Sequence, residues 1–184
     1  MADVPEVKGQ GKWGRDAWRF GIVFAGCLVV FGTIYIFLRH SSIFVPFLEF
    51  NARLSSSILN LFGASTVVDG VAVSGDKFSF QVSAECTSTI FTAIFVSAVA
   101  AWPSTAKEKL RGIAIVVPFL FLINLVRIVS LFYIGSAFPK FLNLAHFFLW
   151  QIFLILLTIG LWLLWAEKMV HNKPHAGKPP TNVS

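Results

Sequence analysis

Residues 20–38 read FGIVFAGCLVVFGTIYIFL, an apolar run that contains no charged side chain. A helix rises about 1.5 Å per residue, so a run of this length crosses a hydrocarbon core of about 30 Å. No small-residue cleavage site follows it, only Leu38-Arg39-His40, so we expect a retained anchor rather than a signal peptide. The run therefore predicts a membrane protein.

The composition of the whole chain agrees with this prediction. Of the 184 residues, 56% are hydrophobic and 13% are charged, and the mean hydropathy is +0.75. Soluble domains carry about 25% charged residues, and one domain is the usual number at this length. The net charge is +6, but the basic residues flank the hydrophobic runs. Membrane topology and contact with anionic lipid therefore explain them better than nucleic acid does.

Three further apolar runs are typical of spanning helices. The first covers about residues 85–102 and is stopped by a proline and a basic stretch. The next begins at Gly112, is interrupted by charge only at Arg127, and ends before a short loop over 136–142. The last covers about residues 144–165.

Two segments between the first and second runs have a different character. Residues 43–62 have apolar side chains at helical spacing but also contain charged and polar residues. This pattern favours an amphipathic helix in the membrane interface that is ended by Gly63. The alternative is a short membrane-spanning helix of low hydrophobicity. Residues 64–82 alternate β-branched and polar residues, with Asp69-Gly70 as a turn signal. The predicted fold is thus an all-α membrane protein, a bundle of about four transmembrane helices with an interfacial helix and a small extracytoplasmic β-hairpin.

The distribution of positive charge predicts the orientation. With four spans and the N-terminus inside, ten of the 15 Lys and Arg residues fall on the cytoplasmic side, as the positive-inside rule requires. We therefore expect a cytoplasmic basic N-tail over 1–19, a transmembrane domain over 20–166, and a disordered cytoplasmic tail over 167–184. The protein is expected in the plasma (inner) membrane, and no oligomeric state is predicted.

Three polar residues in different runs are predicted to lie at one depth. Cys86 is 16 residues from Trp102, and Arg127 is 16 residues from Arg111, so each lies about 24 Å along its helix from the inner boundary. For His146 the corresponding distance is about 28 Å. All three should therefore meet near the outer face of the membrane.

Each of the three has a structural alternative, but together they suit one chemistry. A cysteine at a helix start is more often structural, an arginine near the boundary can snorkel, and a histidine can anchor at the interface. As a set, Cys86 can be the nucleophile that forms an acyl thioester, Arg127 an oxyanion stabiliser, and His146 a general acid or base. Glu85 either orients a partner or is a solvated carboxylate at the helix start. One outer cysteine and one outer histidine are too few ligands for zinc, so we expect no metal and no cofactor.

The motifs around these residues resemble the exosortase/archaeosortase family of membrane cysteine transpeptidase-like enzymes. AECTS contains Cys86, NLVRI contains Arg127, LAHFFLW contains His146, and LNLFGASTVVDGVAV precedes the cysteine. The short chain is similar to compact subfamilies such as the exosortase H type. Family members usually have Ser-Gly or Thr-Gly after the cysteine, where this chain has Thr87-Ser88. In the family the arginine is usually assigned as proton donor and the histidine as transition-state stabiliser; simple pKa reasoning suggests the reverse.

The resemblance implies a function. Family substrates are exported proteins whose C-terminal sorting signal combines a short motif, a hydrophobic helix and a basic cluster. The enzyme would cut near the motif at the extracytoplasmic face and pass the thioester to water or to a surface acceptor. Two other hypotheses are a non-enzymatic membrane subunit or scaffold for envelope polymer export, and a small transporter that uses Arg127 as a charge site. Besides substrates, the expected partner is membrane lipid, with no nucleic acid.

Overall fold

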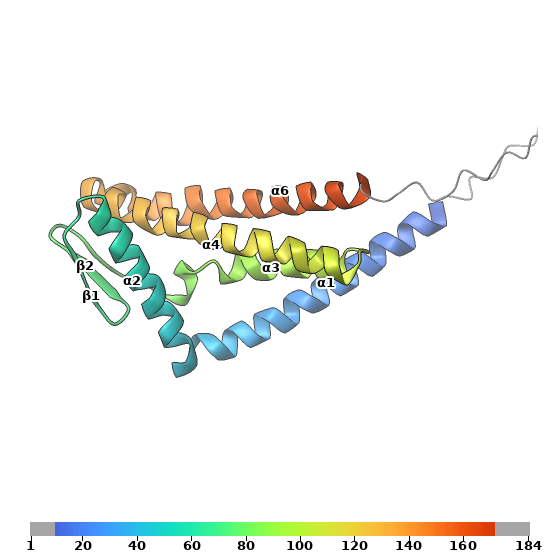
Figure 1. Ribbon diagram of the computed structural model, residues 1–184, viewed down its shortest axis with the longest axis horizontal. Coiled ribbons are helices and arrows are strands. Elements are labelled where there is room, and N and C mark those ends of the chain that lie inside the picture. The colour runs from blue at the N-terminus through green and yellow to red at the C-terminus, as the bar shows by residue number, and fades with distance from the viewer. Residues whose placement is uncertain (1–9, 172–184) are drawn as a thin grey trace, which may run out of the picture.

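The computed structural model describes residues 10–171, and the chain there is mostly helical (Figure 1). Its elements follow one another as α1 (Gln10–Arg39), η1 (Ser42–Phe44), α2 (Val45–Leu61), β1 (Thr66–Asp69), β2 (Ala72–Gly75), β3 (Ser79–Gln81), η2 (Ala84–Cys86), α3 (Thr89–Ala101), α4 (Ala106–Ala137), η3 (Pro139–Phe141), α5 (Leu142–Leu144), the π-helical turn η4 (Ala145–Leu149) and α6 (Trp150–His171).

Three helical stretches are long and apolar enough to cross a membrane. They cover Gly14–Arg39, Ala106–Ala137 and Pro139–Lys168. The fourth span predicted over 85–102 is not confirmed, because the apolar helix there, α3, has only 13 residues. At about 1.5 Å per residue it is about 20 Å long, which is shorter than a hydrocarbon core of about 30 Å.

The predicted tails lie partly outside the described residues. Helix α1 begins at Gln10, so the second half of the segment 1–19 is helical. The expectation of a disordered tail from residue 167 is wrong for its first residues, because α6 continues to His171. Residues 172–184 lie outside the described part of the chain.

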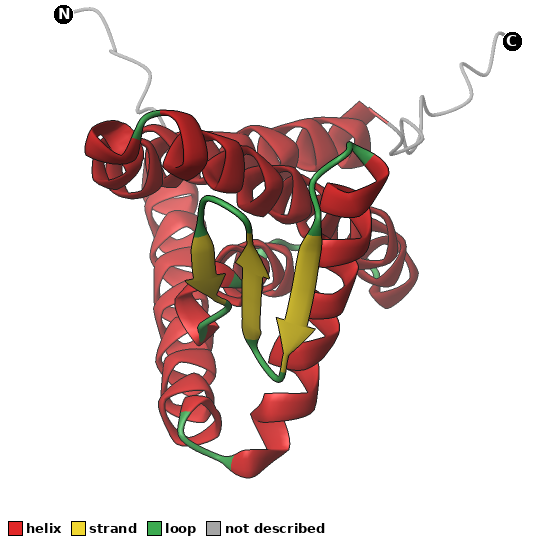
Figure 2. Cartoon of the chain, turned by 90° about the vertical axis from the view of Figure 1, so that its left-hand side faces the viewer, coloured by secondary structure: helices red, strands yellow, loops and turns green. Residues whose placement is uncertain are grey.

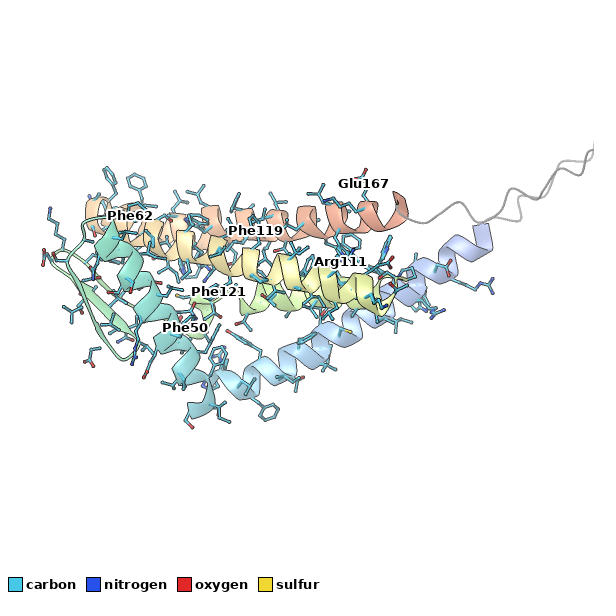
Figure 3. The ribbon with its side chains drawn as sticks, viewed as in Figure 1. Phe50, Phe62, Arg111, Phe119, Phe121 and Glu167 are labelled. Carbon is cyan, nitrogen blue, oxygen red and sulfur yellow. The ribbon has the colours of Figure 1, made fainter. Side chains whose placement is uncertain are left out.

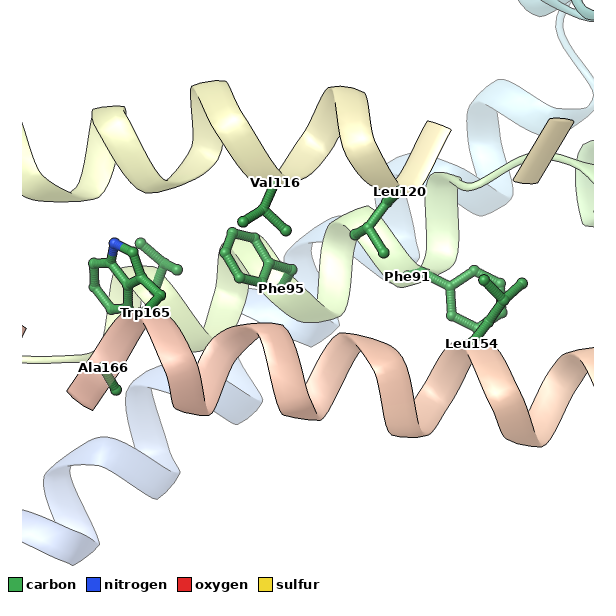
Figure 4. Packing of buried hydrophobic residues seen from close by; sticks show 8 residues of the cluster. Phe91, Phe95, Val116, Leu120, Leu154, Trp165 and Ala166 are labelled. Atoms are coloured by element: carbon green, nitrogen blue, oxygen red, sulfur yellow. The ribbon is translucent and has the colours of Figure 1, made fainter. Parts of the chain in front are cut away.

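The short helix α3 is nevertheless the centre of the main hydrophobic core. Its phenylalanines lie between α4 and α6, and α1 packs obliquely across it (Figures 1 and 4). The cluster consists of Phe91, Phe95 and Val99 from α3, Val116 and Leu120 from α4, and Leu154, Trp165 and Ala166 from α6. At one end of the cluster α4 and α6 approach so closely that a Cβ on Gly112 would overlap the indole of Trp165. Burial of about eight apolar side chains, each worth about 1.5–3 kcal/mol, fixes these three helices together.

Helix α4 begins earlier than the sequence predicted. Thr105 accepts a hydrogen bond from the Glu108 amide, and the Glu108 carboxylate accepts one from the Thr105 amide, which forms a capping box. The basic segment before Gly112 is therefore the first turns of α4 and not a loop. Arg111 on α4 and Glu167 on α6 both lie towards the end of the molecule that is opposite the sheet (Figure 3).

The predicted hairpin is present and is extended by a third strand. The strands pair antiparallel in the order β1-β2-β3, and the β1–β2 turn uses Gly70 at φ 57°. The sheet packs on α4 where side chains are small: a Cβ on Gly135 would lie 2.6 Å from the Phe78 ring. The sheet and α2 together form one end of the molecule, and Figure 2 shows the sheet lying in front of the helices.

Helix α2 confirms the predicted helix over 43–62, while its position at the membrane interface stays a prediction. It ends before Gly63, which has φ +85°. Its inner face is small and polar and is formed by Asn51, Ala52, Ser55, Ser56 and Leu59. The apolar stripe noted in the sequence points outward, with Phe50 54% exposed and stacked on Phe121 of α4 at a centroid distance of 6.3 Å (Figure 3). An outward apolar stripe beside a charged edge suits a helix that lies in the interface.

Candidate functional site

Cys86 ends a short 3₁₀ turn, η2, that connects the sheet to α3. The sequence predicted a helix start at Glu85, but α3 begins at Thr89. The turn is held by the Cys86 amide, which donates to the Ser83 carbonyl at 2.9 Å, and by the buried Thr87 hydroxyl, which donates to the Ala84 carbonyl at 2.7 Å. The thiol thus lies on a fixed turn just outside the apolar helix.

The absence of a glycine after this cysteine does not distort the turn. Thr87 has φ −94° and Ser88 has φ −77°. Both values are ordinary for residues that carry a side chain, so no glycine-only conformation is needed here. The departure from the family's usual Ser-Gly or Thr-Gly is therefore accommodated.

Asn124 of α4 joins the Cys86 turn to Arg127. The Asn124 side chain is 0% exposed, and its Nδ2 donates to the Cys86 carbonyl oxygen at 2.7 Å. Its Oδ1 accepts from Nη1 of Arg127 at 3.5 Å. Asn124 lies three residues before Arg127 on the same helix, but its bond to Cys86 spans 38 residues and has no local signal in the sequence.

Arg127 is deeply buried and contacts His146. Only 2% of the arginine is exposed, and its Nη2 lies 3.1 Å from Nε2 of His146. A guanidinium has donors and no acceptor, so Nε2 must accept this hydrogen bond. His146 is then the neutral tautomer with its proton on Nδ1, which leaves Nδ1–H free to donate elsewhere.

His146 lies in the π-helical turn η4, directly before α6. A π turn inserts one extra residue into a helix and changes the direction of the side chains that follow, and such turns are frequent at functional sites. Here the turn brings the imidazole of the third spanning stretch to Arg127 of the second. The structure thus brings together all three residues that the sequence predicted to meet, at the end of the molecule formed by the sheet and α2.

Cys86 and His146 line one cavity of about 230 Å³. Its other walls come from β3 with the residue before it, from α4 and from α5. Among the described residues, those that line this cavity do not include Arg127. A molecule in the cavity would therefore meet the thiol and the imidazole, with the guanidinium behind them.

The surroundings of Cys86 favour its thiolate. Burial raises the pKa of the thiol, but hydrogen bonds from His146 and Ser83 lower it by more, so that the pKa falls to about 7. The Ser83 hydroxyl lies 3.5 Å from Sγ. Because Nε2 of His146 accepts from Arg127, Nδ1–H is the ring donor that remains for Sγ. Ser83 was not singled out from the sequence, although a hydroxyl three residues before a cysteine is a signal for such a local bond.

The neighbouring Glu85 has a different role. It is exposed and forms an ion pair with Arg39 at 3.6 Å, which connects the end of α1 to the Cys86 turn. Its pKa is lowered by hydrogen bonds from its own backbone and from Ser83. Of the two roles considered from the sequence, a solvated carboxylate beside the cysteine describes it better.

No carboxylate in the described part of the chain forms an ion pair with Arg127. Within the same residues no group of three or more His, Cys, Asp or Glu side chains suits a metal ion. Cys86 is the anionic group that interacts electrostatically with the buried guanidinium.

Comparison with known proteins supplies the family. The model of the transmembrane exosortase family matches residues 10–166, which is most of the chain and includes Cys86, Arg127 and His146. A search of curated proteins and a search of solved structures each found no match. The family match and the three apolar helices make this an integral membrane protein. The chain belongs to the transmembrane exosortase family.

Proposed function

We propose that this protein is a membrane cysteine peptidase or transpeptidase that cleaves the C-terminal sorting signal of exported proteins. The observation that carries the proposal is the cavity in which a thiol of lowered pKa faces a neutral imidazole, with a buried guanidinium behind it. A thiolate beside a proton donor is the arrangement that acyl transfer to cysteine needs.

The first half of the reaction follows from this geometry. The Cys86 thiolate attacks the carbonyl carbon of the scissile peptide bond and forms a carbon–sulfur bond, which leaves the charge on the carbonyl oxygen. Collapse of this intermediate breaks the carbon–nitrogen bond, and the leaving amine takes the proton from Nδ1 of His146 while Nε2 accepts one from the Arg127 guanidinium. The imidazole therefore stays neutral throughout the step.

The second half releases the product. Water, or an amine or hydroxyl of a surface acceptor, attacks the thioester carbonyl and gives its proton back to Nδ1 of His146, while Nε2 returns its proton to Arg127. The carbon–sulfur bond breaks and the Cys86 thiolate is restored. His146 is thus the group that exchanges protons with the substrate.

The position of Arg127 supports this division of roles. The guanidinium is 2% exposed, contacts His146 and Asn124, and does not line the cavity. A substrate oxyanion in the cavity meets other groups first. Arginine is protonated at physiological pH, so Arg127 enters the reaction as the donor to Nε2. We therefore assign Arg127 as the residue that holds His146 and supplies it with a proton.

We place this chemistry at the extracytoplasmic face, with both termini in the cytoplasm. In support, the start of α1 and the end of α6 lie towards the same end of the molecule, opposite the sheet and the site (Figure 1). The count of basic residues in the sequence favours the same orientation.

A pair of cysteine variants tests the proposal. In cells that make exported proteins with a C-terminal motif, hydrophobic helix and basic cluster, Cys86→Ala should remain in the membrane while full-length precursor accumulates. Cys27→Ala is the matched control, because Cys27 lies midway along α1, away from the cavity, and it should process precursor normally. Normal processing by Cys86→Ala would end the proposal.

A further inference from the structure

The outer edge of β3 is the open edge of the sheet. At the opposite edge, β1 is covered by α2: the Thr66 amide donates to Asn60 Oδ1 at 2.7 Å, and Asn60 Nδ2 donates to the Thr66 carbonyl at 3.1 Å. This amide side chain takes the place of a neighbouring strand. In the described part of the chain β3 pairs only with β2, and Figure 2 shows it as the outermost short strand.

The register decides which backbone groups of β3 are free. The Gly75 amide donates to the Phe78 carbonyl, and the Val82 amide donates to the Val71 carbonyl. In an antiparallel ladder the inward-facing residues alternate, so Phe80 also faces β2. Ser79 and Gln81 therefore direct their N–H and C=O groups away from the sheet, and both residues are exposed.

The same strand forms one wall of the cavity that contains the nucleophile. Phe80 and Gln81 line it together with Cys86 and His146, and Asn143 of α5 lines it as well. A chain laid along the free edge of β3 would thus have its backbone carbonyls beside the thiol. An unpaired edge strand is a template for an incoming extended peptide, which it binds through main-chain hydrogen bonds.

We propose that the substrate's sorting motif binds in an extended conformation as a fourth strand on the free edge of β3, which places its scissile bond over Cys86. This rests on the proposed function and specifies how that site holds its substrate. Ser79 and Gln81 offer two N–H and two C=O groups, enough to align a segment of about three to five residues. Recognition at these positions is by backbone, so the side chains of Ser79 and Gln81 are not needed for it.

Two variants at one position separate backbone from side chain. Gln81→Pro removes an outward N–H without touching the bonds to β2, and proline is tolerated on an edge strand in this orientation. It should slow precursor cleavage by about tenfold or more, because the substrate loses one hydrogen bond and keeps an unpaired carbonyl. Gln81→Ala keeps this N–H and changes only the side chain, so it should cleave several times faster than Gln81→Pro. Labelling of Cys86 by a small maleimide should be unchanged in both.

Equal cleavage by Gln81→Pro and wild type would overturn the proposal, as would an equal loss in Gln81→Ala. Loss of a dimer in Gln81→Pro with cleavage intact would also overturn it, since the edge would then pair with a second copy. If Gln81→Pro also loses maleimide labelling, the proposal is tested with wild-type enzyme instead, by replacing each residue of one precursor's motif with proline in turn. Slower cleavage at every second position supports binding as a strand. Slower cleavage without this alternation refutes it. Normal cleavage by Cys86→Ala would remove the proposed function itself, which distinguishes the two failures.

Discussion

Replacing His146 with alanine should raise the pH at which Cys86 becomes reactive. In the intact site the thiol has a pKa of about 7, so about half of it is thiolate at pH 7. The variant removes the hydrogen bond that lowers the pKa most and leaves the burial that raises it. The bonds from Ser83 remain, so the pKa should rise towards the ordinary value of about 8.5, at which about 3% is thiolate at pH 7. The reaction of Cys86 with an alkylating reagent at pH 7 should therefore slow by up to about fifteenfold.

The sign of the pH dependence is fixed by the chemistry. Only the thiolate reacts with the reagent, so the labelling rate rises as the pH increases through the pKa of the thiol. The midpoint should lie near 7 in the intact protein and shift upward, towards about 8.5, in His146→Ala. At a pH well above both midpoints the two proteins should label at similar rates, which separates a change of pKa from a blocked cavity.

The assay is alkylation of purified protein over a pH series, carried out in a Cys27→Ala background so that Cys86 is the one thiol. His40→Ala is the matched control, because His40 is exposed beside the end of α1 and contacts Arg39 instead of Cys86. Its midpoint should match that of the intact protein. An unchanged midpoint in His146→Ala would refute the reasoning, and so would an intact protein that titrates near 8.5.

Two further variants test the packing and the polar chain. Gly112→Ala should destabilise the protein by about 1–3 kcal/mol, because its new Cβ overlaps the Trp165 indole. The control is Gly160→Ala, whose Cβ would meet open space, so this variant should be neutral or slightly stabilising. Thermal unfolding in detergent compares the two variants. Asn124→Ala should leave the Cys86 carbonyl without its buried donor and lower precursor processing by about tenfold, while the amount of protein in the membrane is measured in the same cells. Full processing by the Asn124 variant would contradict a positioning role.

The sequence predicted the meeting of Cys86, Arg127 and His146 because depth in a membrane can be counted in residues. Each lies a known number of helical rises from a charged or aromatic boundary, and the lipid forces apolar runs to be regular helices. The structure confirms their juxtaposition. Their catalytic roles stay predictions.

The sequence prediction failed at the start of α3, where local hydrogen bonds of polar side chains replace the helix that the hydropathy predicted. Thr87 donates to the Ala84 carbonyl and lies 2.7 Å from the Thr89 hydroxyl, so these hydroxyls stabilise a turn in place of the first helical turn. The opposite error occurred at α4. Thr105 and Glu108 form a capping box that is visible in the sequence, but the charges beside it were taken as the end of a helix and not as its start.

Three hydrogen bonds connect the four site residues. The Cys86 carbonyl accepts from Asn124, Asn124 accepts from Arg127, and Arg127 donates to His146, which in turn lowers the pKa of the Cys86 thiol. Nε of Arg127 is buried without a partner, so removal of Asn124 or His146 would leave a second guanidinium nitrogen unsatisfied.

The charges lie along the same chain of contacts. Arg127 has no carboxylate partner in the described chain, and Cys86 is the group whose negative charge acts on it. A neutral histidine between the two keeps them from forming a direct ion pair, and that leaves the thiolate exposed to the cavity as a nucleophile. The pKa of Cys86 is lowered by His146 and Ser83, so Arg127 acts on the thiol through the imidazole that it holds in place.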